Sequence, residues 1–217
     1  MRTLIPIAVL VLLLASCRGD ESNDSSIPTP PPSTSPSFPA TTTSADAAST
    51  PSQFVSVTEA GGSVTIAFTE NGASRELRGA MRDTGKRKYT LADGPVIYEV
   101  KPNDEGGFKL RMPDGKLRWK VKVTPEKIKI SDNEQNDHPF ELKVRDGDRV
   151  KVVAPGDREL GNVRFASGKI EVEKASGKTI FTANATKATG AYGVLLLDGI
   201  PDYERYILIA EILSRGR

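Results

Sequence analysis

The chain has 217 residues and carries 30 Lys and Arg against 28 Asp and Glu, so its net charge is only slightly positive. This balance does not indicate a nucleic-acid-binding protein, and we expect no nucleic acid among its partners. A single cysteine, Cys17, and a single histidine, His138, exclude an internal disulfide, a Cys/His zinc site and thiol redox chemistry. Stability must therefore come from a hydrophobic core.

The first residues predict export from the cytoplasm. Arg2 supplies a positive start, residues 4–14 form an apolar stretch too short for a comfortable membrane span, and small residues lead to Cys17. The run LASC at residues 14–17 resembles the lipobox of bacterial lipoproteins. The resemblance implies that residues 1–16 are a signal peptide and that Cys17 carries the acyl chains that anchor the mature protein. An ordinary secretory signal with an unrelated cysteine is the alternative.

Residues 17–52 read as a tether. Serine, threonine and proline dominate, and Ile27 and Phe38 are almost the only large apolar residues. Such a segment cannot bury enough surface to fold, so we expect a disordered linker with polyproline II character. Arg18 stands where the lipoprotein rule of enteric bacteria places the Asp that retains a protein in the inner membrane. We therefore expect a cell-membrane lipoprotein, on the periplasmic or surface face of the outer membrane in a double-membraned host.

Residues 53–217 predict one mainly β domain. Segments such as GSVTIAF, PVIYEVK and PFELKVR alternate apolar and polar residues, and turn dipeptides such as Asn71-Gly72 and Asp146-Gly147 separate them. The spacing of the turns predicts an antiparallel meander of about twelve strands.

The C-terminal part changes pattern. Residues 192–197 read as an apolar strand, and Pro201 with Asp202 then forms a helix start. Apolar residues cover nearly every side of a helix over residues 203–213, which favours a helix enclosed by the rest of the domain. The alternative is one more strand in a β-sandwich, because periodicity alone does not separate short apolar runs.

This order of elements resembles the tubby C-terminal-like fold, which is shared by tubby proteins, phospholipid scramblases and LURP-one-related proteins. The segments FKLRMPDGKLRWKVKV and YGVLLLDGIPDYERYILIAEIL carry the resemblance, which covers about residues 75–213. It implies a meander closed into a barrel around a C-terminal hydrophobic helix, and a module that binds a ligand or a lipid headgroup. The long C-terminal membrane-like segment of scramblases is not found, so scramblase activity is not implied.

A cationic sheet face is the main candidate site. If Phe108, Leu110, Trp119 and Val121 point inward, the alternating basic residues point outward, which gives the set Lys109, Arg111, Lys116, Arg118, Lys120, Lys122, Lys127 and Lys129. Such a face could bind the phosphate groups of anionic lipid or an acidic envelope polymer. The alternative is a solvated face whose lysines prevent edge-to-edge pairing of strands.

Other polar segments point to no chemistry of their own. The loop SDNEQNDHPF is rich in oxygen ligands but lacks the glycine and closing glutamate of an EF-hand, so we interpret it as a polar hairpin loop without a metal. Gly177-Lys178-Thr179 reads as a turn, and His138 has no triad context. Residues 203–206 read as the rim and plug of the barrel. We expect no catalytic residue and no cofactor.

These patterns together predict a lipid-anchored, non-enzymatic binding module of the cell envelope. Its ligand would be an anionic lipid headgroup or an apolar molecule. An envelope scaffold that binds a partner protein without a small ligand is the alternative. A carboxylate-dependent hydrolase comes third, because no catalytic pair stands out in the sequence.

Overall fold

The computed structural model describes residues 53–82, 84–92, 94–103 and 106–216. The predicted signal peptide, Cys17 and the linker lie outside the described residues. The first strands are β1 (Gln53–Ala60), β2 (Ser63–Glu70), β3 (Ala73–Met81), β4 (Arg87–Leu91), β5 (Val96–Pro102), β6 (Phe108–Arg111) and β7 (Leu117–Val123). They are followed by β8 (Lys127–Ser131), β9 (Phe140–Arg145), β10 (Arg149–Val153), β11 (Glu159–Ala166), β12 (Lys169–Lys174) and β13 (Thr179–Asn184). A 3-10 helix, η1 (Ala191–Leu196), and an α-helix, α1 (Asp202–Ser214), follow β13.

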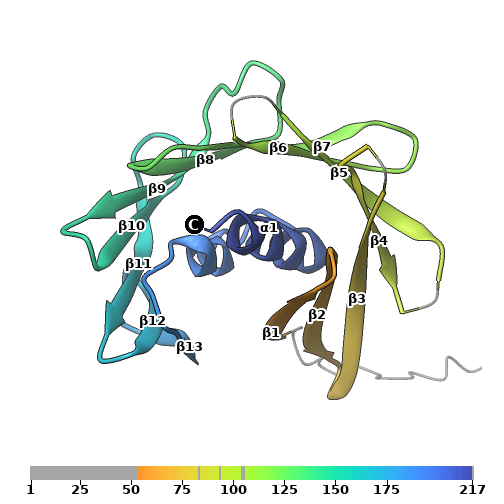
Figure 1. Cartoon of the computed structure of the whole chain (residues 1–217). Helices are drawn as coiled ribbons and strands as arrows, with labels where there is room; N and C mark the ends of the chain where they lie inside the picture. Colours follow the sequence, from red (N-terminus) through yellow and green to blue (C-terminus); the bar gives the residue numbers. More distant parts are fainter. Residues whose placement is uncertain (1–52, 83, 93, 104–105, 217) are drawn as a thin grey trace, which may run out of the picture. The chain divides into compact units, whose positions relative to one another are not determined.

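All thirteen strands form one sheet in which each strand pairs with the next along the chain. Every neighbouring pair is antiparallel, which confirms the meander with thirteen strands in place of about twelve. The sheet curves around α1, which lies in its hollow (Figure 1). Because the strands share a single sheet, the two-sheet sandwich does not hold. The closure into a barrel is not confirmed, since no pairing joins β1 to β13 in the described sheet.

Glycine-containing turns join the strands where the dipeptides predicted them. Asn71 and Gly72, between β2 and β3, have φ values of 51° and 76°. Ser167 and Gly168, between β11 and β12, have φ values of 52° and 75°. Two consecutive residues with positive φ suit the right-handed twist of a tight hairpin, which accounts for the register of these strands.

The core lies between the inner face of the sheet and α1. Inward-facing residues such as Phe68, Leu110 and Ile130 have no exposed surface. The predicted enclosed helix is confirmed: α1 begins at Asp202 after the N-cap Pro201, and its central apolar residues are buried. In the described part of the chain, no helix is long and apolar enough to cross a membrane.

The strand expected over residues 192–197 is wrong, because this segment forms η1. It packs against α1 and against β10, β11 and β12. Gly193 permits this close packing: a Cβ atom there would lie 2.9 Å from Cγ2 of Val152. Burial on several sides of an apolar run is compatible with a strand or a helix, so the sequence pattern did not separate them.

Candidate functional site

A band of lysine and arginine side chains covers the outer face of the central strands, on the side away from α1. Six of the predicted residues lie there: Lys109 and Arg111 on β6, Lys120 and Lys122 on β7, and Lys127 and Lys129 on β8. The residues that alternate with them, such as Leu110 and Val121, are fully buried. The structure therefore gathers these six cations on one face.

The band extends beyond the predicted strands. We define the cationic face as the outer face of β5–β11, with Lys101, Lys109, Arg111, Lys120, Lys122, Lys127, Lys129, Lys143, Arg145, Arg149, Lys151 and Arg164. Many of these cations stand directly opposite another cation on the neighbouring strand. The opposed pairs are Lys101–Lys109, Lys109–Lys120, Lys122–Lys129, Lys127–Lys143, Lys143–Lys151, Arg145–Arg149 and Arg149–Arg164.

Two carboxylates hold part of this face together. Glu134, in the loop before β9, accepts from Nζ of Lys109 at 2.6 Å and pairs with Nη2 of Arg111 at 2.7 Å. Glu141 on β9 lies 2.8 Å from Nζ of Lys143. The hydrogen bond from Lys109 lowers the pKa of Glu134, and the one from Lys143 lowers the pKa of Glu141. Both acids therefore stay charged and fix the cations in place.

Two predicted residues do not join the cationic face. Lys116 lies in the exposed turn between β6 and β7. The prediction that Arg118 faces solvent is wrong, because its Nε donates to the buried Glu204 at 2.8 Å. The β6–β7 register shifts so that Arg111 opposes Leu117, which leaves Arg118 as the extra residue of a bulge. A bulge redirects the side chain of its extra residue, here toward α1.

Glu204 joins the first turn of α1 to the sheet. It is 1% exposed and accepts from Nε1 of Trp119 on β7 and from the hydroxyl of Tyr98 on β5 at 2.9 Å. With Arg118, these donors come from two strands and surround one carboxylate. Burial, and then the neighbouring Glu204 charge, raises the pKa of Tyr98 to about 12.

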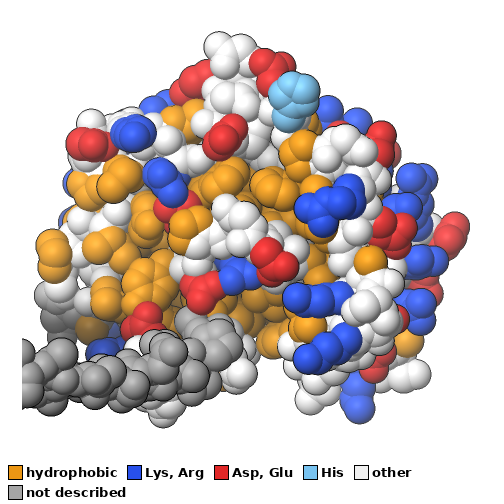
Figure 2. Space-filling view, turned by 180° about the vertical axis from the view of Figure 1, so that it is seen from behind, with side chains coloured by type: hydrophobic (Ala, Val, Ile, Leu, Met, Phe, Trp, Pro, Cys, Tyr) orange, Lys and Arg blue, Asp and Glu red, His pale blue; other side chains and the backbone are white. Residues whose placement is uncertain are grey.

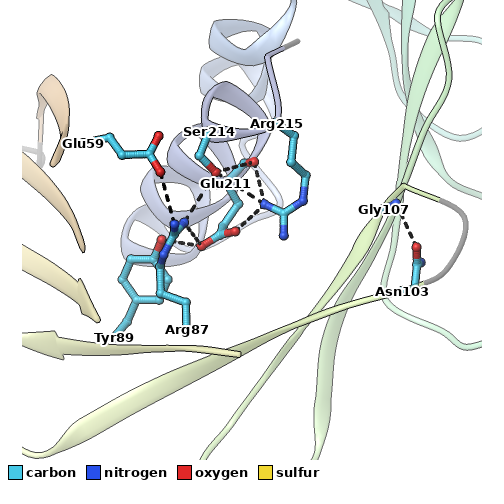
Figure 3. Close-up of polar contacts among 8 residues, drawn as sticks. All are labelled: Glu59, Arg87, Tyr89, Asn103, Gly107, Glu211, Ser214 and Arg215. Carbon is cyan, nitrogen blue, oxygen red and sulfur yellow. Dashed lines mark hydrogen bonds and ion pairs between the residues drawn. The ribbon is translucent and has the colours of Figure 1, made fainter. Parts of the chain in front are cut away.

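Glu211 joins the C-terminal part of α1 to the sheet (Figure 3). It is 1% exposed, and it accepts from Nη1 of Arg87 at 2.8 Å and from the hydroxyl of Tyr89 at 2.7 Å. Arg215, one turn later, also donates to it. Arg87 continues the network outward, because its Nη2 lies 3.3 Å from Glu59 on β1. This network joins α1 to β1 and β4.

Gly79 makes room for the Glu211 network. It stands directly opposite Tyr89 in the β3–β4 pair. A Cβ atom at Gly79 would lie 2.6 Å from the Tyr89 ring and 2.9 Å from Cδ of Arg87. Because Tyr89 is fully buried, its ring has no free space to move into. The glycine therefore lets both donors reach Glu211.

Glu204 and Glu211 position the helix, and their chemistry is that of paired ions. A cavity of about 260 Å³ adjoins Glu211, but the side chains around it include Arg87, Arg215 and Glu59, which are already paired with one another or with Glu211. The sequence reading missed this role, although two glutamates on a helix that is otherwise apolar all round were a signal. Their partners lie far away in sequence, so the pairs were not predictable.

The oxygen-rich loop before β9 is occupied by its own contacts. Asn133 donates to the backbone oxygen of Asp137 at 2.9 Å and accepts from its backbone N–H at 2.8 Å. No three His, Cys, Asp or Glu side chains gather as a metal-ligand set in the residues that the structure describes. His138 is exposed, and Gly177 lies in the β12–β13 turn with φ 84°.

Comparison with protein-family models, with curated proteins and with solved structures finds no match to this chain. Its function is therefore inferred below from the chemistry of the described residues.

Replacing Glu211 with Gln should lower the free energy of unfolding by about 3 kcal/mol, because two guanidinium groups lose their charged partner in a buried site. Glu171→Gln, at an exposed position of β12, is the matched control and should change it by less than about 0.5 kcal/mol. Urea unfolding followed by circular dichroism measures both. Equal effects of the two substitutions would contradict the role given to Glu211.

Stability should also fall in alkali as Tyr98 ionises. Its pKa rises from 10.0 to about 12 on folding, so the folded state holds the phenol proton more tightly than the unfolded state. The stability that this proton contributes is complete below the pKa of Tyr98 in the unfolded state. It is lost as the pH rises through the pKa of Tyr98 in the folded state. The difference in unfolding free energy between the wild type and Tyr98→Phe should therefore shrink from about pH 10 to about pH 12. A constant difference across that range would refute this prediction.

Proposed function

We propose that this protein is a non-enzymatic binding module of the bacterial cell envelope, anchored through Cys17, whose cationic face binds an anionic, phosphate-bearing lipid surface. The observation that carries the proposal is the row of directly opposed cations on β5–β11. Phosphate groups placed between these cations would relieve their repulsion and gain charge-assisted hydrogen bonds.

The opposed cations work against the stability of the sheet. Like charges directly across two strands are destabilising, on a scale of about 0.2–1 kcal/mol per pair. Opposite charges at the same positions would reverse the sign, as Lys129 and Glu141 do across β8 and β9. Five acids pair with some of these cations, namely Glu134, Glu141, Asp157, Glu159 and Glu173. The direct opposition of cations on neighbouring strands persists beside these ion pairs, and we propose that it serves binding.

Protection against edge pairing does not explain these lysines. Strands β6, β7 and β8 lie in the middle of the meander and are paired on both sides. Protective charges belong on edge strands, where they block the approach of another chain. The edge strand β13, with the sequence TIFTAN, has no charged residue at all.

The cationic face is the convex side of the sheet, with α1 on the concave side (Figure 1). A ligand can therefore bind there without disturbing the core. Figure 2 shows blue side chains gathered along the margin formed by β9–β12, with acidic side chains between them. Each basic residue close to an anionic membrane adds about 1 kcal/mol of attraction.

In this proposal, the linker predicted over residues 17–52 sets where the cationic face acts. A flexible chain of about 35 residues has a root-mean-square span of roughly 30–35 Å, so the domain could reach the membrane surface that holds Cys17. Acyl chains on Cys17 would supply the anchor, since two or more chains hold a protein stably at a membrane. In a double-membraned host the proposed site is the outer membrane.

The tubby-like fold is part of the proposal. An apolar α1 enclosed by a meander of antiparallel strands supports the resemblance. The described sheet departs from the closed barrel of that fold, because β1 and β13 do not pair with each other. Of the other candidates, an envelope scaffold is favoured by edge strands that carry no Lys or Arg. A hydrolase is not favoured, because Glu204 and Glu211 each bind a guanidinium group.

Neutralising Lys101, Lys122 and Arg145 to Gln together should weaken binding to vesicles by about 100-fold, from about 1 kcal/mol per basic residue. Arg118 is left intact, because it holds Glu204. The measurement is flotation of a chain of residues 18–217, which keeps every described element, with phosphatidylcholine vesicles that contain phosphatidylglycerol.

Two controls make this test specific. Neutralising three exposed cations outside the cationic face, Arg75, Arg82 and Lys178, should leave binding nearly unchanged. Vesicles of phosphatidylcholine alone should bind neither the wild type nor either triple variant. Equal losses from both triple variants, or binding that is insensitive to salt, would remove the cationic face as the site.

Cys17→Ser should abolish incorporation of labelled fatty acid, because no acyl chain can attach. In high salt, which screens the cationic face, it should also move the protein from the membrane pellet to the soluble fraction. Ser22→Ala, in the linker, is the control and should leave both unchanged. A Cys17→Ser protein that still incorporates the label would disprove the anchor.

A further inference from the structure

The sheet ends in two free edges that face a common cavity. In the described sheet, β1 pairs only with β2, and β13 pairs only with β12. A cavity of about 490 Å³ is lined by Gln53 and Phe54 of β1, by residues 179–182 of β13, and by Leu195, Arg205 and Tyr206 beneath them. Figure 1 shows the opening between β1 and β13, on the side of the sheet opposite β6–β8. We call this cavity the seam.

The direction of the strands decides what fits the seam. Because every neighbouring pair is antiparallel and there are thirteen strands, β1 and β13 run in the same direction. Direct pairing of the two edges would be parallel, in a sheet that is otherwise wholly antiparallel. One additional strand that runs opposite to both would pair antiparallel on each side. From these directions we infer that the seam binds a single extended segment of a partner polypeptide, which completes the sheet by strand insertion.

The chemistry of the edges supports this inference. Strands β1, β2 and β13 carry no Lys or Arg, whereas each strand from β3 to β12 carries at least one. The one charged residue on the two edge strands is Glu59 of β1, which pairs with Arg87. Proteins usually guard free edges with charges, proline or bulges. A bulge at Val55 is present on β1, but Val55 itself is apolar and 53% exposed. Unguarded edges with free N–H and C=O groups are the usual sites of strand addition.

Aromatic side chains form the floor of the seam, on which an inserted strand could pack. The Phe54 ring lies 5.6 Å from the Phe181 ring and 5.5 Å from the Tyr206 ring, so apolar side chains bridge the two edges below the strand level. Arg205, which also lines the seam, is paired with Asp198 and Asp202, so its charge is already balanced.

The occupant must have both of its edges free. A strand of a second copy is already paired within its own sheet, so it would have to leave that sheet to enter the seam. A segment that is extended but not part of a sheet meets no such barrier. The seam itself is uncharged apart from Arg205, which favours an uncharged segment with alternating apolar side chains. This proposal uses none of the residues of the cationic face.

The test uses the chain of residues 18–217 and a peptide with the uncharged part of the β2 sequence, SVTIAFT, which runs antiparallel to β1 in the fold. The same peptide with alternate backbone nitrogens methylated is the control, because it keeps the side chains and loses the paired N–H groups. We expect binding of the first peptide only. Amide hydrogen exchange should slow by at least about tenfold in both β1 and β13 when the peptide binds.

A variant pair tests the place of binding. Thr182→Lys puts a charge on the exposed edge of β13 within the seam, and should weaken peptide binding by at least about tenfold. Ser74→Lys adds the same charge at an exposed position of β3 and should leave binding unchanged. Unchanged melting temperatures show that both variants fold.

Several outcomes would overturn the proposal. Equal binding of the methylated peptide excludes backbone pairing, and protection of only one edge excludes insertion. Failure of the first peptide to bind also counts against it. If only a chain that starts at Gln53 binds the peptide, the protein's own preceding segment occupies the seam. If binding is lost as protein concentration rises, a second copy occupies it.

Discussion

Burial of two carboxylates on an otherwise apolar helix is the constraint on which this structure depends. Enclosing α1 takes Glu204 and Glu211 out of water, which is unfavourable unless each charge is paired and hydrogen-bonded. Arg118 and Arg87 provide the pairing from β7 and β4. Because the two ends of the helix are held by different strands, a rotation or a shift along the helix axis would break both networks. The helix therefore packs against the sheet in a single position.

The sequence pattern predicted what depends on near neighbours and missed what depends on distant ones. Alternation and glycine turns located the strands, and Pro201 with Asp202 located the start of α1. The strand expected at residues 192–197 became η1, because an apolar run that is buried on several sides has no diagnostic period. The reach of Arg118 to Glu204 depends on a bulge, and a bulge is set by strand pairing. The open seam is likewise a property of the whole sheet.

Charge divides the outer surface of the sheet into two regions of different character. The middle strands carry opposed lysines and arginines, and their repulsion is partly relieved by Glu134, Glu141, Asp157, Glu159 and Glu173. The first and last strands carry no cation. One region is suited to phosphate groups and the other to a backbone, and they lie on opposite sides of α1 (Figure 1). Under the two proposals, the domain would hold a polypeptide on one side while its other side meets a membrane.

The position of α1 after all the strands has a consequence for how the chain reaches its native state. During synthesis the strands emerge first and can form hairpins with their neighbours, since each pairs only with the next. The inner face of that growing ribbon has nothing to pack against until α1 follows. Side chains such as Phe68 and Ile130 stay exposed to solvent until then, and Arg87 and Arg118 lack the carboxylates of α1 that they pair with. Packing of the core is therefore delayed until α1, which follows the last strand, is available.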